Sequence, residues 1–199
     1  MNGRMEVKPT PLLIDSFMPS CDVTIAEHVI VRRDPSTTFR SARELDFLSI
    51  HTPVLHVAMW ARGIPARLTG HSAEPPPRLV LSQGDPLPGW VVLGEQPGYE
   101  LVFGAVGKFW QPNIEWRDVA AEDFAAFAEP GWGKIAASFS VVPYGERASL
   151  LTYECRTTTT DSRSRQKFLR YWELMRPFIA HILRATVRTI RDNTEQPKT

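Results

Sequence analysis

A long amphipathic helix predicted at the C-terminal end limits the possible folds more than any other feature of the chain. Thr160 or Asp161 can cap its first turn, and seven arginines and one lysine lie on its outer faces. Between residues 162 and 192, side chains suited to a core recur every three or four positions, at Phe168, Trp172, Met175, Ile179, Ile182, Thr186 and Ile190. Pro177 predicts a kink near Glu173 because proline removes a backbone hydrogen bond. A helix of this length extends about 46 Å at ~1.5 Å per residue, so its apolar stripe needs an equally extended partner.

That partner is predicted to be an antiparallel sheet, because strand patterns joined by turns fill most of the remaining chain. Residues 22–33 alternate apolar and polar side chains, as a half-buried strand does. Residues 89–110 predict a hairpin, in which Pro97 and Gly98 fit the centre of a type II turn. Gly104 and Gly107 in its second arm indicate bends or bulges. Further strands are predicted at residues 79–83, 114–116, 132–142 and 147–159.

Short helices and irregular segments account for the rest of the sequence. Helices are predicted at 36–48 and at 53–62, the second capped by Thr52 and ended by Gly63, with a helical turn at 122–128. Residues 1–20 contain three prolines and no periodicity, so we expect a flexible N-terminal arm. The folded domain is expected over residues 21–192, with a disordered tail at 193–199. The sequence therefore predicts an α+β fold, in which a curved antiparallel sheet of about six to seven strands wraps around the C-terminal helix, with two short helices after the first strand.

In this order of elements, residues 20–192 resemble the START-like or Bet v 1-like (SRPBCC) superfamily, which includes polyketide cyclases and lipid-transfer proteins. Three segments carry the resemblance, DVTIAEHVIVRRDP, EQPGYELVFGAVGKFW and TTTTDSRSRQKFLRYWELMRPFIAHIL. The resemblance implies a helix-grip fold with a cavity between sheet and helix, entered past the short helices. It brings no fixed catalytic residues. The long arm and the proline-rich residues 63–88 depart from the family pattern.

Composition and motifs argue against several classes of function. A formal net charge of +1 gives no strong field for nucleic acid, and no apolar run is long enough for stable membrane insertion. We expect a cytoplasmic protein, because Asp15 interrupts the only apolar run near the N-terminus. Cys21 and Cys155 are too few for a disulfide framework and are expected to be free. Zinc-binding, nucleophile-elbow and phosphate-loop motifs are absent, so no metal, cofactor or catalytic residue is predicted.

Aromatic and soft side chains are the candidates for lining a ligand cavity, since such cavities are mostly apolar with a few placed polar groups. These candidates are Trp60, Phe103, Trp110, Trp116, Phe139, Tyr153, Trp172, Met175 and Ile179. The competing interpretation is that they interlock into a solid core. Candidate polar groups in the cavity are His28, Glu100, Glu154 and Arg156. They could act as acids, bases or anion holders, or they could form a solvated sheet face with charge pairs.

Three functions are consistent with these features. The first is binding or carriage of a hydrophobic small molecule, lipid-like or polyketide-like, which the apolar candidate lining favours. The second is an enzyme of the cyclase, aromatase or dehydratase kind, which requires two or three of the polar candidates and Tyr153 to converge in the cavity. The third is a protein-interaction module with a solid core, docking through an apolar helix at 53–62. The sequence leaves the ligand, any reaction and formation of a homodimer open.

Overall fold

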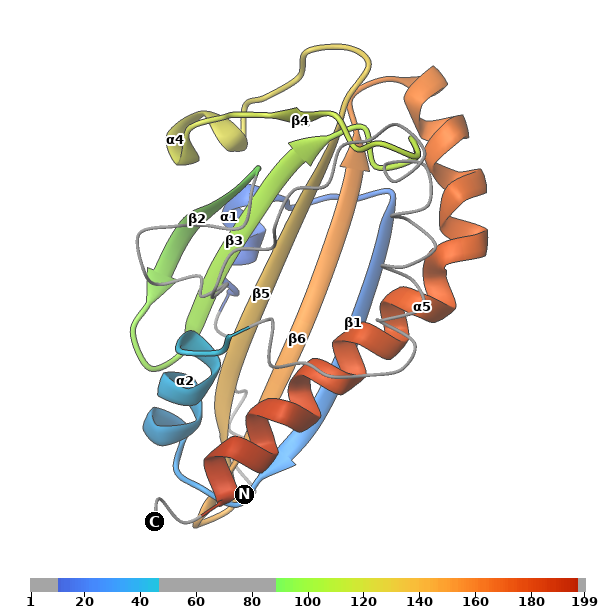
Figure 1. Cartoon of the computed structure of the whole chain (residues 1–199). Coiled ribbons are helices and arrows are strands. Elements are labelled where there is room, and N and C mark those ends of the chain that lie inside the picture. The colour runs from blue at the N-terminus through green and yellow to red at the C-terminus, as the bar shows by residue number, and fades with distance from the viewer. Residues whose placement is uncertain (1–10, 47–88, 197–199) are drawn as a thin grey trace, which may run out of the picture.

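The computed structural model describes residues 11–46 and 89–196, and within these ranges six strands form one open antiparallel sheet (Figure 1). The strands are β1 (Val23–Val31), β2 (Trp90–Gln96), β3 (Glu100–Gly107), β4 (Trp116–Arg117), β5 (Gly133–Tyr144) and β6 (Ala148–Thr159). Their order is β1-β6-β5-β3-β2, with β4 paired to β3, and every pairing is antiparallel. One long helix lies over the concave face of this curved sheet, so the α+β helix-grip architecture predicted from the sequence is confirmed.

Four helices accompany the sheet in the described part of the chain. They are α1 (Ile14–Phe17), α2 (Pro35–Arg43), α4 (Ala121–Phe124) and α5 (Ser162–Glu195). The carboxylate of Asp161 caps α5 by accepting the Ser164 backbone N–H at 2.9 Å, as the sequence predicts. Pro177 lies inside this helix, which changes direction partway along its length (Figure 1). The predicted helix at 53–62 and the predicted strand at 79–83 fall outside the described residues.

The C-terminal end of α5 is held by the loop that follows β1. The Glu195 side chain accepts the Arg32 backbone N–H at 2.7 Å, and its backbone carbonyl accepts the Arg33 guanidinium at 3.2 Å. Thr194, which is buried, donates its hydroxyl to the Ile190 carbonyl. Residues 193–195, expected in a disordered tail, therefore continue the helix. No local sequence pattern predicts these long-range contacts.

The hairpin of β2 and β3 contains the predicted turn, but its irregularity lies in the other strand. Gly98 has a φ of +77°, and the Tyr99 N–H bonds the Gln96 carbonyl at 2.9 Å, which fits a type II turn with Pro97 and Gly98 at its centre. The register shifts between Val92 and Gly94 of β2, whereas β3 pairs regularly with β5 through both of its interior glycines. The bulge predicted at these glycines is therefore on the facing strand.

Gly104 instead permits close packing on the convex side of the sheet. A Cβ at this position would lie 2.8 Å from Leu93, 2.9 Å from the Phe124 ring and 2.9 Å from the backbone carbonyl of Ile135. Such contacts are well inside van der Waals distance. Only a residue without a side chain allows the α4 aromatic to rest directly on β3.

The two faces of the sheet carry separate apolar clusters. On the concave face, α2 and α5 cover side chains of β1, β3, β5 and β6, and the cluster is closed by Leu183, Val187 and Ile190 of α5. On the convex face, α1 and α4 pack with a second cluster whose buried members are Ile14, Met18, Leu93, Val102, Val106, Phe124, Trp132 and Ala136. The buried apolar side chains thus divide between two layers, one on each face of the sheet.

The N-terminal segment belongs to the convex layer. The carboxylate of Glu100, itself fully buried, accepts the backbone N–H groups of Leu13 and Ile14, the second at 3.2 Å. Ile14 and Met18 are buried beside it. Residues 11–18 are therefore packed, although the sequence predicted a flexible arm over 1–20. A four-residue helix is too short to produce periodicity, and Glu100, which holds this segment, lies 86 residues after Ile14 in the sequence.

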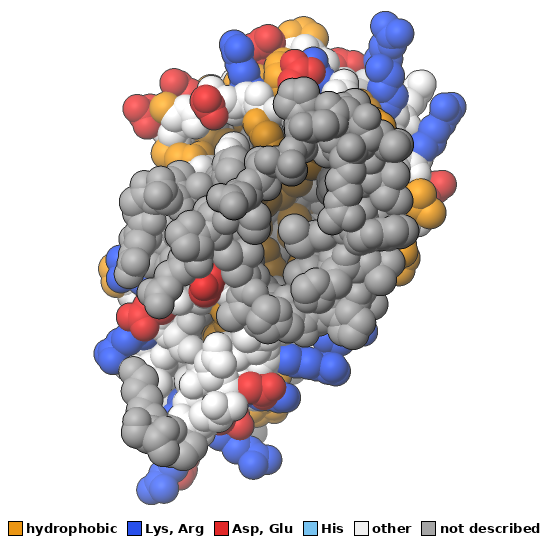
Figure 2. Space-filling model, in the orientation of Figure 1, with side chains coloured by type: hydrophobic (Ala, Val, Ile, Leu, Met, Phe, Trp, Pro, Cys, Tyr) orange, Lys and Arg blue, Asp and Glu red, His pale blue; other side chains and the backbone are white. Residues whose placement is uncertain are grey.

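The two halves of α5 are buried to different extents. Beyond Leu183 the inner side chains are buried, but between Phe168 and Leu183 no residue is. The inner side chains of that stretch, among them Trp172, Met175 and Ile179, are only half-buried. Lys and Arg side chains project from the outer edge of this half, in the upper right of Figure 2. The inner side chains in the N-terminal half of α5 are therefore less completely covered than those in its C-terminal half.

Candidate functional site

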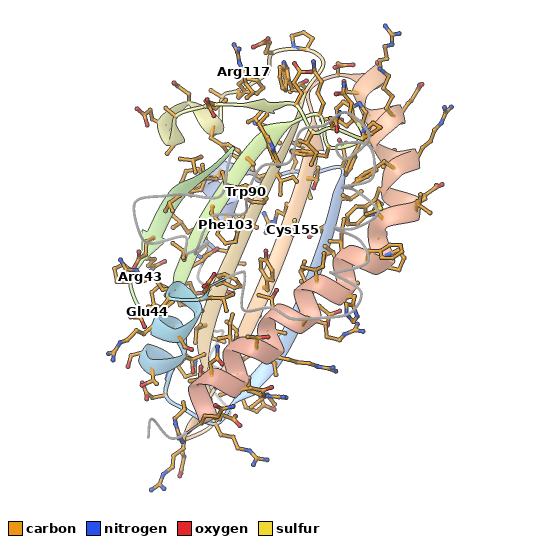
Figure 3. The ribbon with its side chains drawn as sticks, viewed as in Figure 1. Arg43, Glu44, Trp90, Phe103, Arg117 and Cys155 are labelled. Atoms are coloured by element: carbon orange, nitrogen blue, oxygen red, sulfur yellow. The ribbon has the colours of Figure 1, made fainter. Side chains whose placement is uncertain are left out.

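Four aromatic rings from four strands form a continuous surface on the concave face. Trp90 and Phe103 have ring centroids 5.6 Å apart, and Phe139 lies 5.6 Å from Phe103 and 4.5 Å from Tyr153. The register explains their meeting, because Phe139 pairs directly with Tyr153 and the neighbouring strands are aligned with them. Trp90, Phe103 and Cys155 lie on the sheet face that looks toward α5 (Figure 3).

Around these rings lies a belt of apolar side chains that are only partly covered. Those packed against the concave cluster while remaining partly buried include Ile25, Val29, Trp90, Val92, Cys155 and Ile179. They come from β1, β2, β6 and the N-terminal half of α5, so they surround the aromatic rings on several sides. A partly exposed apolar surface of this kind is stabilised by further burial, at roughly 25 cal/mol per Å².

Tyr153 supplies a polar group to this apolar surface. Its side chain is 7% exposed and packs against Phe139 and Phe103, yet its hydroxyl has no hydrogen-bond partner among the described residues. Burial raises the pKa of the phenol far above its usual range, so the hydroxyl stays protonated. Buried tyrosine hydroxyls normally find a partner. This one can both donate to and accept from a bound molecule.

Replacing Tyr153 with phenylalanine should leave the free energy of unfolding unchanged or raise it by about 1 kcal/mol. The change removes a hydroxyl that has no hydrogen-bond partner among the described residues, and it preserves the ring contacts. Urea denaturation of the two proteins measures the difference. A loss above about 1 kcal/mol would show that the hydroxyl already has a partner in the folded protein.

Cys155 lies beside Tyr153 on the concave face and pairs with Ile25 of β1. Burial raises the pKa of its thiol, and the Glu154 carboxylate raises it further. A thiol that stays protonated is a poor nucleophile and metal ligand. We therefore treat Cys155 as part of the apolar lining; Cys21, as predicted, is also free.

The four polar candidates lie on the convex face, away from the aromatic surface. Strand alternation and register place His28 opposite Thr152, with 2.8 Å between the His28 Nδ1 and the Thr152 hydroxyl. Arg156 donates to Glu154 at 2.7 Å. Glu100 holds the N-terminal segment. These groups therefore do not converge with Tyr153, contrary to the arrangement that the enzyme hypothesis requires.

The remaining predicted residues are dispersed. Trp110 lines a surface pocket at the start of α5, and Trp116 packs edge-on against Phe109, with ring centroids 5.8 Å apart. Trp172 lies next to Phe168 along α5, with ring centroids 6.0 Å apart. Trp60 falls outside the described residues. Of the predicted lining residues, Phe103, Phe139, Tyr153 and Ile179 meet in the concave cluster, whereas Met175 does not belong to it. Trp90, which the sequence did not single out, packs against the same cluster.

Within residues 11–46 and 89–196, no group of three histidine, cysteine, aspartate or glutamate side chains is placed to hold a metal ion. Among the helices in these ranges, none is both long and apolar enough to cross a membrane.

Comparisons with known proteins find distant structural similarity only. No family model and no curated protein sequence matches the chain. Protein MLL2253 from Mesorhizobium loti aligns with a TM-score of 0.36 and 12% identity over 87% of this chain and 100% of that one. TTHA0849 from Thermus thermophilus aligns with a TM-score of 0.33 and 8% identity over 86% and 97%. The Zhui aromatase/cyclase from Streptomyces sp. R1128 aligns with a TM-score of 0.28 and 10% identity over 87% and 96%. Similarity at this level does not establish a family.

Proposed function

We propose that the protein binds an apolar small molecule between the concave face of the sheet and the N-terminal half of α5. The supporting observation is the contrast within α5, where no residue between Phe168 and Leu183 is buried although Ile179 packs against the concave cluster. A solid core would bury these side chains, as it does from Leu183 onward. A bound molecule supplies the missing contacts and removes apolar surface from water.

The surface chemistry favours an uncharged ligand with one hydrogen-bonding group. Trp90, which is half-buried, adds an aromatic ring beside Phe103, and the Tyr153 hydroxyl offers the polar contact. Glu27 also lies on the concave side, but its carboxylate is held by Arg184 of α5 at 2.6 Å. A ring-containing, mostly apolar molecule fits these features better than an ion.

Binding accounts for these side chains more simply than catalysis does. A cyclase or dehydratase needs an acid and a base near the reacting atoms. The candidates for those roles lie across the sheet from Tyr153, and Cys155 stays protonated. We therefore place binding or carriage ahead of an enzymatic role.

A fluorescence titration with N-phenyl-1-naphthylamine, an uncharged apolar probe, tests the proposal. We expect saturable binding by the unmodified protein. Ile179→Trp, which fills space on the inner side of α5, should weaken binding by about tenfold or more, equivalent to about 1.4 kcal/mol. Leu174→Trp, on the same helix but 69% exposed, is the matched control and should bind the probe normally.

A second variant tests the same surface from β1, and thermal unfolding separates loss of binding from loss of folding. Ile25→Phe adds bulk from β1 and should also weaken binding. Thermal unfolding of each variant shows whether the fold is retained. The proposal fails if the unmodified protein does not bind the probe, or if folded Ile179→Trp and Ile25→Phe both bind as tightly as Leu174→Trp.

A further inference from the structure

A second recess lies at the N-terminal start of α5, and its chemistry differs from that of the apolar surface on the concave face. It is a pocket of about 380 Å³, formed where the segment after β3, the loop before β5 and the first turns of α5 meet. Lys108, Trp110 and Pro130 come from the first two segments, and Arg163, Ser164 and Lys167 come from α5. Its volume lies in the range of pockets that hold small molecules.

The pocket is strongly basic. Arg163 and Lys167 have no carboxylate partner in the described part of the chain, whereas Arg165, Arg184 and Arg191 of the same helix each form an ion pair. Lys and Arg side chains gather over this end of α5 in Figure 2. Lys108 pairs with Glu115 at 2.8 Å, but that carboxylate is half exposed, so the pair is weak.

Asp161, the one acid among the described residues that line the pocket, is already engaged. Asp161 accepts the Ser164 N–H, the Ser164 hydroxyl and, at 2.6 Å, the Gly131 N–H, and these bonds hold the pKa of its carboxyl at about 2. It therefore closes the start of the helix and the loop before β5. Among the described contacts it forms no ion pair with the Arg163 or Lys167 side chain.

The placement of these cations is unfavourable without an anion. Arg163 and Lys167 are four residues apart, where like charges on a helix repel. Both lie near the positive end of the helix dipole, and no acidic residue occupies the first turn. An anion held between them would offset both effects.

We propose that this pocket binds a small organic phosphate. A phosphate monoester carries a charge of about −1.5 to −2 at pH 7, which matches the two unpaired cations with Lys108 nearby. Trp110 and Pro130 provide an apolar wall for the organic part. This site is separate from the aromatic surface under α5.

Isothermal titration calorimetry with phenyl phosphate tests this assignment. We expect one phosphate to bind per chain, with affinity falling as salt is raised. The double variant Arg163→Gln with Lys167→Gln should bind about tenfold more weakly or worse, since charge-assisted hydrogen bonds are lost. The control, Arg176→Gln with Arg188→Gln, changes two exposed arginines of α5 outside the pocket and should bind normally.

Two further ligands define the chemistry. Inorganic phosphate should bind more weakly than phenyl phosphate if the apolar wall contributes, and benzoate should bind much more weakly because it carries one charge. The proposal is overturned if phenyl phosphate does not bind, if both double variants lose affinity equally, or if benzoate binds as tightly as phenyl phosphate. Ile179→Trp lies outside the pocket and should not alter phosphate binding, so the two binding proposals fail independently.

Discussion

Replacing Phe124 with alanine should lower the free energy of unfolding by about 3–5 kcal/mol, the usual cost of removing a fully buried phenylalanine. The ring rests on β3 at Gly104, and the Lys134 ammonium lies 5.5 Å from its centroid. Chemical denaturation measures the loss. Phe127→Ala, a half-buried neighbour in the same segment, should cost clearly less. A loss below about 1 kcal/mol for Phe124→Ala would contradict a packed convex layer.

A double-mutant cycle tests whether residues 104 and 124 are in contact. Gly104→Ala alone should cost about 1–3 kcal/mol, because its new methyl group meets Phe124, Leu93 and the Ile135 carbonyl. Combined with Phe124→Ala, the total loss should be smaller than the sum of the two single losses, since the ring is gone. Full additivity would mean that the two positions do not touch.

Replacing Glu100 with alanine should lower the free energy of unfolding by about 2–4 kcal/mol. The buried carboxylate accepts two backbone N–H groups of the N-terminal segment, and alanine leaves both without an acceptor. Glu95→Ala is the control on the adjacent strand, where a surface pair with Arg43 at 3.1 Å should contribute about 1 kcal/mol or less. Equal losses in the two variants would contradict the anchoring role of Glu100.

The same carboxyl should also make stability depend on pH. Burial raises the pKa of Glu100, although the N–H groups of Leu13 and Ile14 oppose the shift. The folded protein therefore keeps this proton to a higher pH than the unfolded chain, whose carboxyl titrates near about 4.3. Between those two pKa values the free energy of unfolding falls as pH rises.

Glu100→Gln should remove that component. Relative to this variant, the unmodified protein should lose stability as pH rises from about 4 through the raised pKa, and the difference should then level off. Urea denaturation of both proteins across a pH series measures it. A relative gain in stability with rising pH would show that the hydrogen bonds outweigh burial.

The elements that the sequence predicts well are those with a local signal. The stripe from Phe168 to Ile190 and the Asp161 cap define α5 without reference to the rest of the chain. Pro97 and Gly98 locate the hairpin turn in the same way. In both cases the signal lies within a few neighbouring residues, although the last turn of α5 also depends on Arg32 and Arg33.

The candidate site was predicted less well, because its polar candidates lie on the opposite face of the sheet from its aromatic ones. In β6 the alternation of Tyr153 with Glu154 and Arg156 already requires opposite faces, as does the three-residue spacing of Glu100 and Phe103 in β3. That signal excludes a shared cavity for these groups. The docking of residues 11–18 onto the convex face has no such signal, because it depends on a single distant carboxylate.

The central claim is that an apolar molecule occupies the space between the concave face and the N-terminal half of α5. Methyl NMR of the unmodified protein during titration with N-phenyl-1-naphthylamine tests it most directly, because each face carries its own reporters. The claim predicts shifts at Ile25, Val29 and Ile179 on the concave side, and little change at Val102 and Val106 on the convex side. Shifts confined to the convex methyl groups, or no shifts at saturating probe, would contradict it.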